Sequence, residues 1–302
     1  MKQLASALAA ALGSWLLSMS AASAQPACDK ACLERIGDAY RAAYLKHDPA
    51  GLPLASKPRF SENGVMMRFP DASWDTVTRE VGPAVTISDV KTGQVGIYTS
   101  IWQNDTPGFL AIRLKIDKGR ISEIEHMLST ARNLSGPPTP IGEIDKYKPD
   151  PNFSAIVAAE KRAPRAKLVP HAYGYFNTLN HNTGEIRGTR FTADAQRIEN
   201  GRLFPEIEKG FKLGYYAFNN QVRREHLLVD EERQVVLSRG FIDHKGVMDN
   251  YTLTDGTVRR SPYREPHSWA FLEMFKINDD HITSVQAVFI GVPYNMDSSW
   301  KK

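Results

Sequence analysis

The 302-residue chain is short of cysteine, has no strong excess of charge of either sign, and lacks the common motifs of serine hydrolases and nucleotide-binding proteins. The 38 Lys and Arg residues stand against 34 Asp and Glu, a formal charge of +4, and no basic cluster alternates with aromatic residues. Nucleic acid is therefore not an expected partner. Neither G-x-S-x-G nor the motifs G-x-G-x-x-G and G-x-x-x-x-G-K-[ST] occur, which argues against a serine hydrolase and a nucleotide cofactor.

The two cysteines, Cys28 and Cys32, lie four positions apart near the N-terminus. In an oxidising compartment such a pair can form a disulfide at the start of a helix, although so small a loop adds little through chain entropy. A metal site would need two further nearby ligands, and the sequence offers none. We expect a structural disulfide or two unmodified thiols, and no metal.

The first 24 residues have the pattern of a secretory signal peptide. Lys2 gives a positive start, Leu4 to Met19 form an apolar stretch, and Ala22-Ser23-Ala24 is a small-residue cleavage site. The stretch is shorter than the roughly 20 residues of a membrane span, and no later stretch is long enough either. We expect cleavage before Gln25 and a periplasmic or secreted protein without a membrane span.

The sequence repeats itself in outline. Three segments recur in the same order, with an offset that grows from 137 to 140 to 161 residues: Glu62-Asn63-Gly64 as Glu199-Asn200-Gly201, Gln94-Val95 as Gln234-Val235, and Leu114-Lys115-Ile116 as Phe275-Lys276-Ile277. Insertions in one copy produce such a drift, and the largest falls at about 245–267. The pattern indicates two copies of one unit.

Each copy begins with a helical pattern and continues with strands. Leu33, Ile36, Tyr40 and Tyr44 have helical spacing in the first copy, and Tyr173, Phe176 and Leu179 have it in the second. Later segments alternate as strands with one buried face do. The proline-rich stretch 133–150 is typical of a linker. We therefore predict an α+β chain with units at 25–132 and 151–302.

This organisation resembles the cone-shaped fold of nuclear transport factor 2 and the SnoaL-like polyketide cyclases, in which a helix packs on a curved antiparallel sheet. The second copy looks like a secreted domain of unknown function found in fungi and bacteria. The residues behind the resemblance are Arg197-Ile198-Glu199-Asn200-Gly201, Val229-Asp230-Glu231-Glu232, Phe275-Lys276-Ile277 with Ile282, and Pro293-Tyr294 ending at Trp300. The resemblance implies an apolar conical cavity that needs no cofactor, in a monomer or a homodimer.

Glu273 is the first candidate for chemistry in that cavity. It aligns with Ile112 of the first copy and alternates in phase with Phe271, Phe275 and Ile277. A carboxyl group on an apolar face has a raised pKa suited to proton transfer. The alternative is an edge strand with Glu273 in solvent.

Arg239 and Asp243 are the next candidates. They alternate in phase with Val235, Leu237 and Phe241, where the 140-residue offset gives Thr99 and Gln103 in the first copy. They can pair with Glu273 or orient a substrate oxygen. A structural ion pair is the alternative.

The remaining candidates surround the insertion at 245–267. Histidine is the acid or base suited to neutral pH, and a lid with tyrosines and arginines could close over a cavity mouth. We assign His226 to catalysis. Six residues are assigned to substrate binding: His244, Tyr251, Tyr263, His267, Trp269 and Phe271. In the first copy, Tyr98, Trp102, Glu123, Glu125 and His126 line a second pocket or serve structure.

These features favour a cofactor-independent lyase or isomerase acting on a hydrophobic, aromatic, oxygenated small molecule. Glu273 or Asp243 would move the proton, while Arg239 and a histidine or tyrosine stabilise the oxyanion. Retro-aldol cleavage, dehydration and epoxide opening can all be catalysed by such a set of acid, base and oxyanion-stabilising side chains. The alternative is a protein that binds a hydrophobic ligand, or an accessory partner, without catalysis.

Overall fold

The computed structural model describes residues 28–132 and 139–301, so the predicted signal peptide lies outside the described residues. The first unit opens with α1 (Lys30–Leu45). Six strands follow: β1 (Leu54–Glu62), β2 (Val65–Met67), β3 (Val77–Asp89), β4 (Gln94–Gln103), β5 (Thr106–Asp117) and β6 (Arg120–Thr130).

The second unit opens in the same way with α2 (Arg165–Leu179). A short helix, α3 (Ile207–Lys212), follows its first two strands. Its strands are β7 (Phe191–Glu199), β8 (Arg202–Phe204), β9 (Gln221–Asp230), β10 (Val235–His244), β11 (Asn250–Thr252), β12 (Val258–Arg260), β13 (His267–Asn278) and β14 (His281–Val292).

The two main sheets have the same topology. Their strand orders are β2-β1-β6-β5-β4-β3 and β8-β7-β14-β13-β10-β9. In both, one pair is parallel, β1 with β6 and β7 with β14, and the other neighbours are antiparallel. Asn63 and Asn200 stand at matching hairpin turns with φ of 52° and 46°. The structure confirms the predicted α+β architecture of two tandem units.

Helix α1 begins at an N-cap and a crosslink. The side chain of Asp29 accepts a hydrogen bond from the Cys32 amide at 2.8 Å, which satisfies one of the free donors of the first turn. A disulfide joins Cys28 to Cys32, with Cα atoms 5.3 Å apart. The helix buries its apolar stripe, Leu33, Ile36, Tyr40 and Tyr44, against the sheet.

Helix α2 packs on the second sheet with Phe176 and Leu179, as the helical pattern predicts, but not with Tyr173. Tyr175 and Phe176 are buried in the core with Leu168, whereas Tyr173 is 45% exposed. The prediction for Tyr173 was wrong because Leu168, Tyr175 and Leu179 lie on one face at helical spacing, and Tyr173 falls beside that face.

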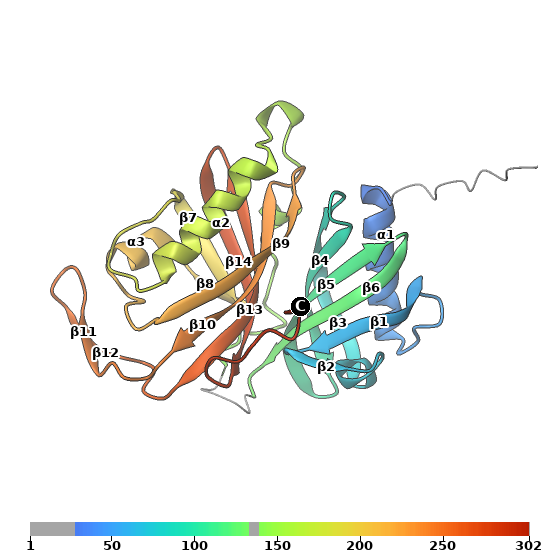
Figure 1. The fold of residues 1–302 in the computed structure, drawn as a ribbon, viewed down its shortest axis with the longest axis horizontal. Helices are drawn as coiled ribbons and strands as arrows, with labels where there is room; N and C mark the ends of the chain where they lie inside the picture. The colour runs from blue at the N-terminus through green and yellow to red at the C-terminus, as the bar shows by residue number, and fades with distance from the viewer. Residues whose placement is uncertain (1–27, 133–138, 302) are drawn as a thin grey trace, which may run out of the picture.

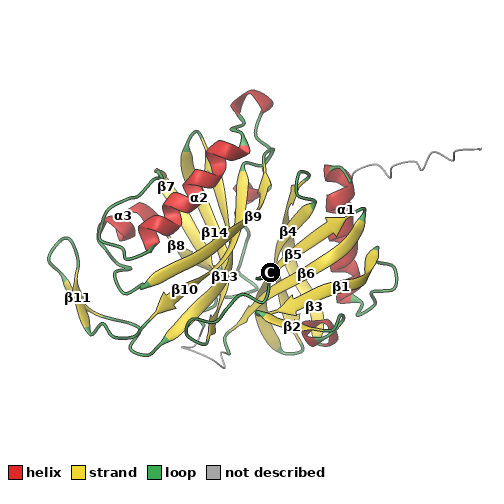
Figure 2. Cartoon of the chain, viewed as in Figure 1, coloured by secondary structure: helices red, strands yellow, loops and turns green. Residues whose placement is uncertain are grey.

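The units pack sheet against sheet, with α1 and α2 on the outer sides (Figures 1 and 2). A single apolar cluster joins the two convex faces, with Tyr98 and Phe109 from the first unit and Leu237 and Leu272 from the second. Arg239 crosses the interface to Glu125 at 2.7 Å. The tandem chain thus buries both convex faces within one molecule.

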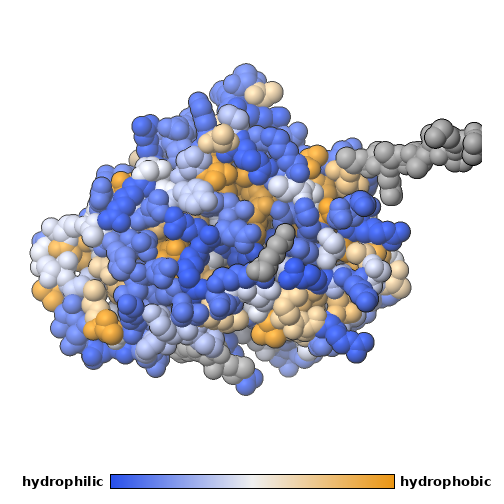
Figure 3. Space-filling view, viewed as in Figure 1, coloured by the Kyte–Doolittle hydropathy of each residue, from blue (hydrophilic) through white to orange (hydrophobic). Residues whose placement is uncertain are grey.

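The described part of the linker and the C-terminal segment also lie against both units. Tyr147 packs edge-on to Phe109 and bonds to Gln286 through its hydroxyl at 2.5 Å. The indole of Trp300 donates to Ser61 at 2.9 Å. The face in Figure 3 is largely hydrophilic with small apolar patches. Within the described residues, no helix is long and apolar enough to cross a membrane.

Candidate functional site

A cavity of about 300 Å³ lies on the concave side of the second sheet, under α2. Most of its wall is aromatic or aliphatic, and its polar side chains come from strands, from α2 and from the segment after α3. The lining residues are Pro140, Tyr175, Leu179, Arg197, Glu199, Arg202, Phe204, Tyr216, Phe218, Asn219, Ile242, His244, Tyr263, Trp269, Phe271, Glu273, Ala287 and Phe289. Such an apolar hollow with a few polar groups is the usual form of a small-molecule site.

Two glutamates face each other across the cavity floor. Glu273 on β13 pairs in register with Ala287 on β14, and Ala287 pairs with Glu199 on β7. Partners in register point to the same face of a sheet, and two inter-strand spacings put these Cα atoms about 10 Å apart. Because Ala287 carries only a methyl group, the space between the two carboxyl groups stays open.

Glu273 is buried, with 4% of its surface exposed. Burial raises the pKa of its carboxyl to about 8, and the nearby Glu199 acts in the same direction, while Arg197 and Tyr175 oppose the shift. Desolvation disfavours the charged form of a carboxyl group. Glu273 is therefore mostly protonated at neutral pH and can donate a proton.

Arg197 holds the other side of the site together. Its Nε lies 2.8 Å from Glu199, and its two terminal nitrogens donate to the hydroxyl groups of Tyr175 at 3.1 Å and Tyr216 at 2.6 Å. Burial opposes its charge, but Glu199 and the tyrosines keep the pKa of Arg197 above its usual value. The site therefore combines a neutral acid with an ion-paired carboxylate.

The three neighbouring positions on β13, β14 and β7 have equivalents in the first unit, where different residues occupy them. Ile112, His126 and Glu62 replace Glu273, Ala287 and Glu199. The imidazole of His126 lies against Glu62 at 3.3 Å and bonds to the Tyr40 hydroxyl at 2.8 Å. Buried aromatic rings of Phe60, Tyr44 and Trp74 surround this network. These positions of the first unit are filled with side chains, so we assign them a structural role.

The outer end of the second-unit cavity is an aromatic and histidine cluster. His244 stacks on His267, with ring centroids 4.7 Å apart and planes at 15°, and Tyr263 packs on both rings. Burial lowers the pKa of His244 to about 3, with a smaller contribution from His267. Burial lowers the pKa of His267 as well, although its hydrogen bond to the Glu265 carbonyl and the charge of Glu265 act in the opposite direction. The two imidazoles are neutral at pH 7.

Arg239 and Asp243 do not reach this cavity, which corrects the sequence prediction. Arg239 pairs in register with Leu272, on the convex face, and bonds to Glu125 and Glu225, each at 2.7 Å. Asp243 accepts two hydrogen bonds from Arg223, at 2.7 and 2.8 Å. Both are structural ion pairs, because consecutive strand residues point to opposite faces and Glu273 is on the other one.

His226 and Tyr251 also lie outside the cavity lining. His226, on edge strand β9, bonds to Ser238 at 2.7 Å and packs on Tyr173, and burial lowers its pKa to about 4. Tyr251 donates to the Tyr215 carbonyl at 3.1 Å. The insertion folds as the β11–β12 hairpin, which projects to one side in Figure 1, so only Tyr263 of its predicted lid residues lines the cavity.

Among the lining residues that sequence reasoning missed are the four that surround the two glutamates or belong to them, namely Tyr175, Arg197, Glu199 and Tyr216. The signal for two of them was present, because Arg197 stands where the first unit has Phe60 and Glu199 repeats Glu62. An arginine and a glutamate two positions apart share one face of a strand. A charged pair on the concave face of an otherwise apolar strand was therefore readable in the sequence.

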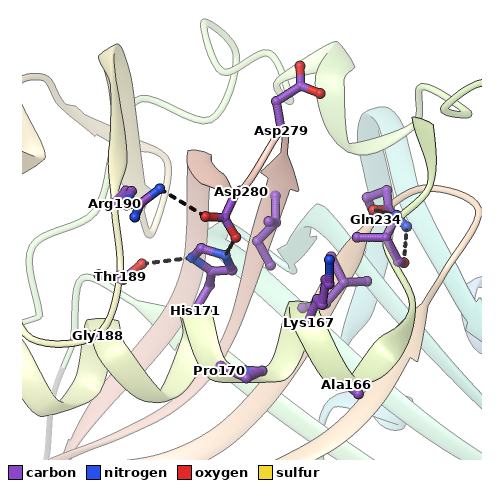
Figure 4. Close-up of a pocket in the computed structure, with 13 residues that line it drawn as sticks. Ala166, Lys167, Pro170, His171, Gly188, Thr189, Arg190, Gln234, Asp279 and Asp280 are labelled. Carbon is purple, nitrogen blue, oxygen red and sulfur yellow. Dashed lines mark hydrogen bonds and ion pairs between the residues drawn. The ribbon is translucent and has the colours of Figure 1, made fainter.

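A larger hollow, of about 860 Å³, lies at the other end of α2 (Figure 4). There His171 bonds to Asp280 at 3.0 Å and to Thr189 at 3.3 Å, and Arg190 donates to Asp280 at 3.1 Å. Both nitrogens of His171 are thus engaged, and the aspartate is 60% exposed. We do not assign chemistry to this hollow, because His171, Thr189, Arg190 and Asp280 are already bonded to one another.

No group of three or more His, Cys, Asp or Glu side chains within the described ranges could hold a metal ion. Of the sequence candidates, the cavity brings together Glu273, His244, Tyr263, Trp269 and Phe271.

Comparisons with known proteins match one region by sequence and single units by structure. Residues 161–289 match a family described as a domain of unknown function (DUF8021). No curated protein matches the chain. A nuclear transport factor 2-like protein of unknown function from Cytophaga hutchinsonii is similar, with 8% identity and a TM-score of 0.24, over 42% of this chain and 100% of that one.

Two further solved structures are similar over one unit's length. One, assigned as a SnoaL-like polyketide cyclase from a Jannaschia species, has 13% identity and a TM-score of 0.29, over 42% of this chain and 89% of that one. The other is a nuclear transport factor 2-like protein from Anabaena variabilis, with 15% identity and a TM-score of 0.29, over 45% and 96%. Each unit of this chain is a helix followed by a six-stranded sheet, and the second unit contains the region that matches DUF8021.

Proposed function

We propose that the second unit is an exported lyase or isomerase that acts on a hydrophobic small molecule by acid and base catalysis without a cofactor. One observation carries the proposal: a buried, protonated Glu273 stands level with the ion-paired Glu199 across an open gap. Two carboxyl groups whose surroundings favour different protonation states form an acid and base pair.

In a dehydration, the carboxylate of Glu199 takes a proton from one carbon while the C–O bond of the adjacent carbon breaks. Glu273 gives its proton to the departing hydroxyl group, which leaves as water, and the electrons of the C–H bond form the new double bond. Solvent exchange then returns the proton from Glu199 to Glu273. In an isomerisation, Glu199 takes the same proton and Glu273 donates a hydrogen bond to the developing oxyanion. Glu199 then returns the proton to a different carbon of the enolate, which restores the carbonyl group and shifts the double bond.

The surrounding residues support such a step by binding and positioning. Arg197 fixes Glu199 through the 2.8 Å ion pair, and Phe271 and Phe289 line the apolar wall. An apolar wall strengthens the electrostatic interactions inside it. The linker residue Pro140 completes the lining, which suits a site formed only when the chain is folded as a whole.

The test is proton exchange at carbon. The full-length chain is incubated in D₂O with a panel of neutral, enolisable aromatic ketones, and loss of the α-proton signal is followed by proton NMR. We expect exchange with at least one member, abolished by Glu273→Gln and by Glu199→Gln. Glu208→Gln, which changes a helix-surface carboxylate outside the cavity, is the matched control.

Binding of these ketones without exchange, dehydration or cleavage would favour the non-catalytic alternative. Equal exchange rates in Glu273→Gln and the unaltered chain would show that Glu273 takes no part in the proton transfer.

A further inference from the structure

The outer end of the cavity holds polar atoms that the protein leaves without partners. Among residues 28–132 and 139–301, His244 Nδ1, His267 Nε2 and Trp269 Nε1 are buried and make no hydrogen bond. His244 is 2% exposed and Trp269 is 5% exposed, and both line the cavity. A buried polar atom without a partner is costly, so these atoms point to a ligand that satisfies them.

The hydrogen bonds around His244 fix which of its nitrogens carries the proton. Asn219 Nδ2 donates to the carbonyl of Leu179 at 3.2 Å, so the other amide atom, Oδ1, is the acceptor that faces His244. His244 Nε2 lies 2.9 Å from that oxygen and must donate to it. His244 Nδ1 therefore carries a bare lone pair.

His267 is fixed in the same way and stacks behind His244. Its Nδ1 lies 2.9 Å from the carbonyl of Glu265 and donates to it, which leaves Nε2 as an acceptor. His244 Nδ1 and His267 Nε2 are therefore acceptors without a donor, and the Trp269 N–H is a donor without an acceptor. A hydroxyl group both donates and accepts, whereas a carboxylate or an ether oxygen cannot supply a proton to His244.

We propose that this outer subsite, formed by His244, Trp269, Phe218 and Tyr263, recognises a neutral hydroxyl group on a flat ring of the ligand. The hydroxyl donates to His244 Nδ1 and accepts from Trp269 Nε1, and the ring packs beside Phe218 and Tyr263, which contact each other edge to face with centroids 5.1 Å apart. The inference rests on the proposed function, since it names the far end of the molecule on which Glu273 would act.

The strand geometry gives the spacing between recognition and reaction. Trp269 and Glu273 lie four residues apart on one face of β13, which corresponds to roughly 13 Å at 3.3 Å per residue. One small ring cannot reach both ends of such a cavity. The substrate class is therefore an elongated, neutral, hydroxyl-bearing molecule with the reactive group at the end remote from the hydroxyl.

The experiment is equilibrium binding of three probes to the full-length chain by isothermal titration calorimetry. The probes are 2-naphthol, 2-methoxynaphthalene, which cannot donate, and 2-naphthoate, which is an anion. We expect 2-naphthol to bind about tenfold more tightly than either of the others, the size of one buried hydrogen bond.

Variants then test whether His244 causes the preference for 2-naphthol over 2-methoxynaphthalene. His244→Gln can still donate to Asn219 but lacks the Nδ1 acceptor, so the ratio of the 2-naphthol and 2-methoxynaphthalene affinities should fall to about one. His281→Gln, at the β13–β14 turn, is the matched control and should keep the ratio. Trp269→Phe should weaken both probes alike, because both have an oxygen that accepts.

Three outcomes would overturn the inference: no binding of 2-naphthol, equal affinities in the unaltered chain, or tighter binding of the anion. The Glu273→Gln variant distinguishes a wrong assignment of the outer subsite from a wrong catalytic role for Glu273. It should keep the preference for 2-naphthol; if it loses the preference, the hydroxyl binds at Glu273 and the outer subsite is refuted while the acid role stands.

Discussion

Glu273 and Glu199 lie level with each other on strands that flank β14, separated only by the methyl group of Ala287. The first is buried among apolar side chains and mostly protonated at neutral pH, and the second is held by Arg197. This relationship gives the second unit a chemistry that the first unit lacks, because His126 and Ile112 occupy the corresponding positions there.

Replacing Glu273 with Gln should change how stability depends on pH. Burial raises the pKa of Glu273 from 4.5 to about 8, so between these values the folded chain binds one proton more than the unfolded chain. The free energy of unfolding therefore falls as pH rises through this window, by up to roughly 5 kcal/mol. Glu273→Gln removes this loss. Urea unfolding should give the variant a higher free energy of unfolding, relative to the unaltered chain, at pH 9 than at pH 5. The same difference between the two proteins at both pH values would contradict the assignment.

Replacing Glu199 with Gln should lower the pKa of Glu273. The negative charge of Glu199 raises that pKa, and its loss also frees Arg197, whose charge already lowers it. Both effects act in the same direction. The carboxyl signal of Glu273, followed by carbon-13 NMR against pH, should titrate at lower pH than in the unaltered chain. Glu225→Gln, on an exposed carboxylate that pairs with Arg239 on the other face, should leave the titration in place; an upward shift in Glu199→Gln would refute the arrangement.

The order of helix and strands, the two units and the placement of Glu273 on the concave face could all be predicted from hydrophobic periodicity and the internal repeat. The choice of Arg239 and Asp243 as partners of Glu273 was wrong because the alignment of the two copies was shifted by one residue. The 140-residue offset matched Val95 with Val235, but the structure pairs Val95 with Leu114 and Val236 with Phe275. A shift of one residue moves every side chain of a strand to the opposite face.

With the corrected offset of 141, Arg239 corresponds to Tyr98 rather than to Thr99. Tyr98 belongs to the cluster between the two sheets, which is also where Arg239 lies. The residues that complete the site come from elsewhere: Tyr175 from α2, Tyr216 from the segment after α3, and Arg197 from β7. Contacts between segments so far apart in sequence depend on the curvature of the sheet, which local patterns do not encode.

Replacing Arg239 with Met tests that correction. The variant leaves Glu125 with Arg113 as its remaining partner, at 2.7 Å, so we expect a loss of about 1–3 kcal/mol in the free energy of unfolding. The Glu273 titration should stay unchanged, since Arg239 is on the opposite face. A shift of the Glu273 pKa in this variant would restore the role that the sequence predicted for Arg239.

Replacing Ala287 with Leu should close the gap between the two carboxyl groups. The added side chain overlaps the space that a substrate would use, so we expect loss of proton exchange and a stability change of about 1–3 kcal/mol from overpacking. His126→Ala, at the equivalent position of the first unit, is the counterpart. It should leave a void and remove one of two side-chain partners of Glu62, which keeps its hydrogen bond from Ser73, and cost about 2–5 kcal/mol, while exchange in the second unit persists. Equal loss of exchange in both variants would contradict a site confined to the second unit.

Replacing Gly201 with Ala tests the contact between the units. Gly201 stands at φ +75°, and an added Cβ would overlap the ring of Phe109 from the first unit. Gly64, at the matching turn of the first unit, has a similar φ of +79°, but its added Cβ would meet only the flexible end of Met296. The left-handed backbone costs both alanine variants about 1–2 kcal/mol, and the rigid ring adds about 1–3 kcal/mol for Gly201→Ala alone. Thermal and urea unfolding of the two variants should therefore differ by that second amount, and equal losses would mean that the β7–β8 turn does not pack on Phe109 in solution.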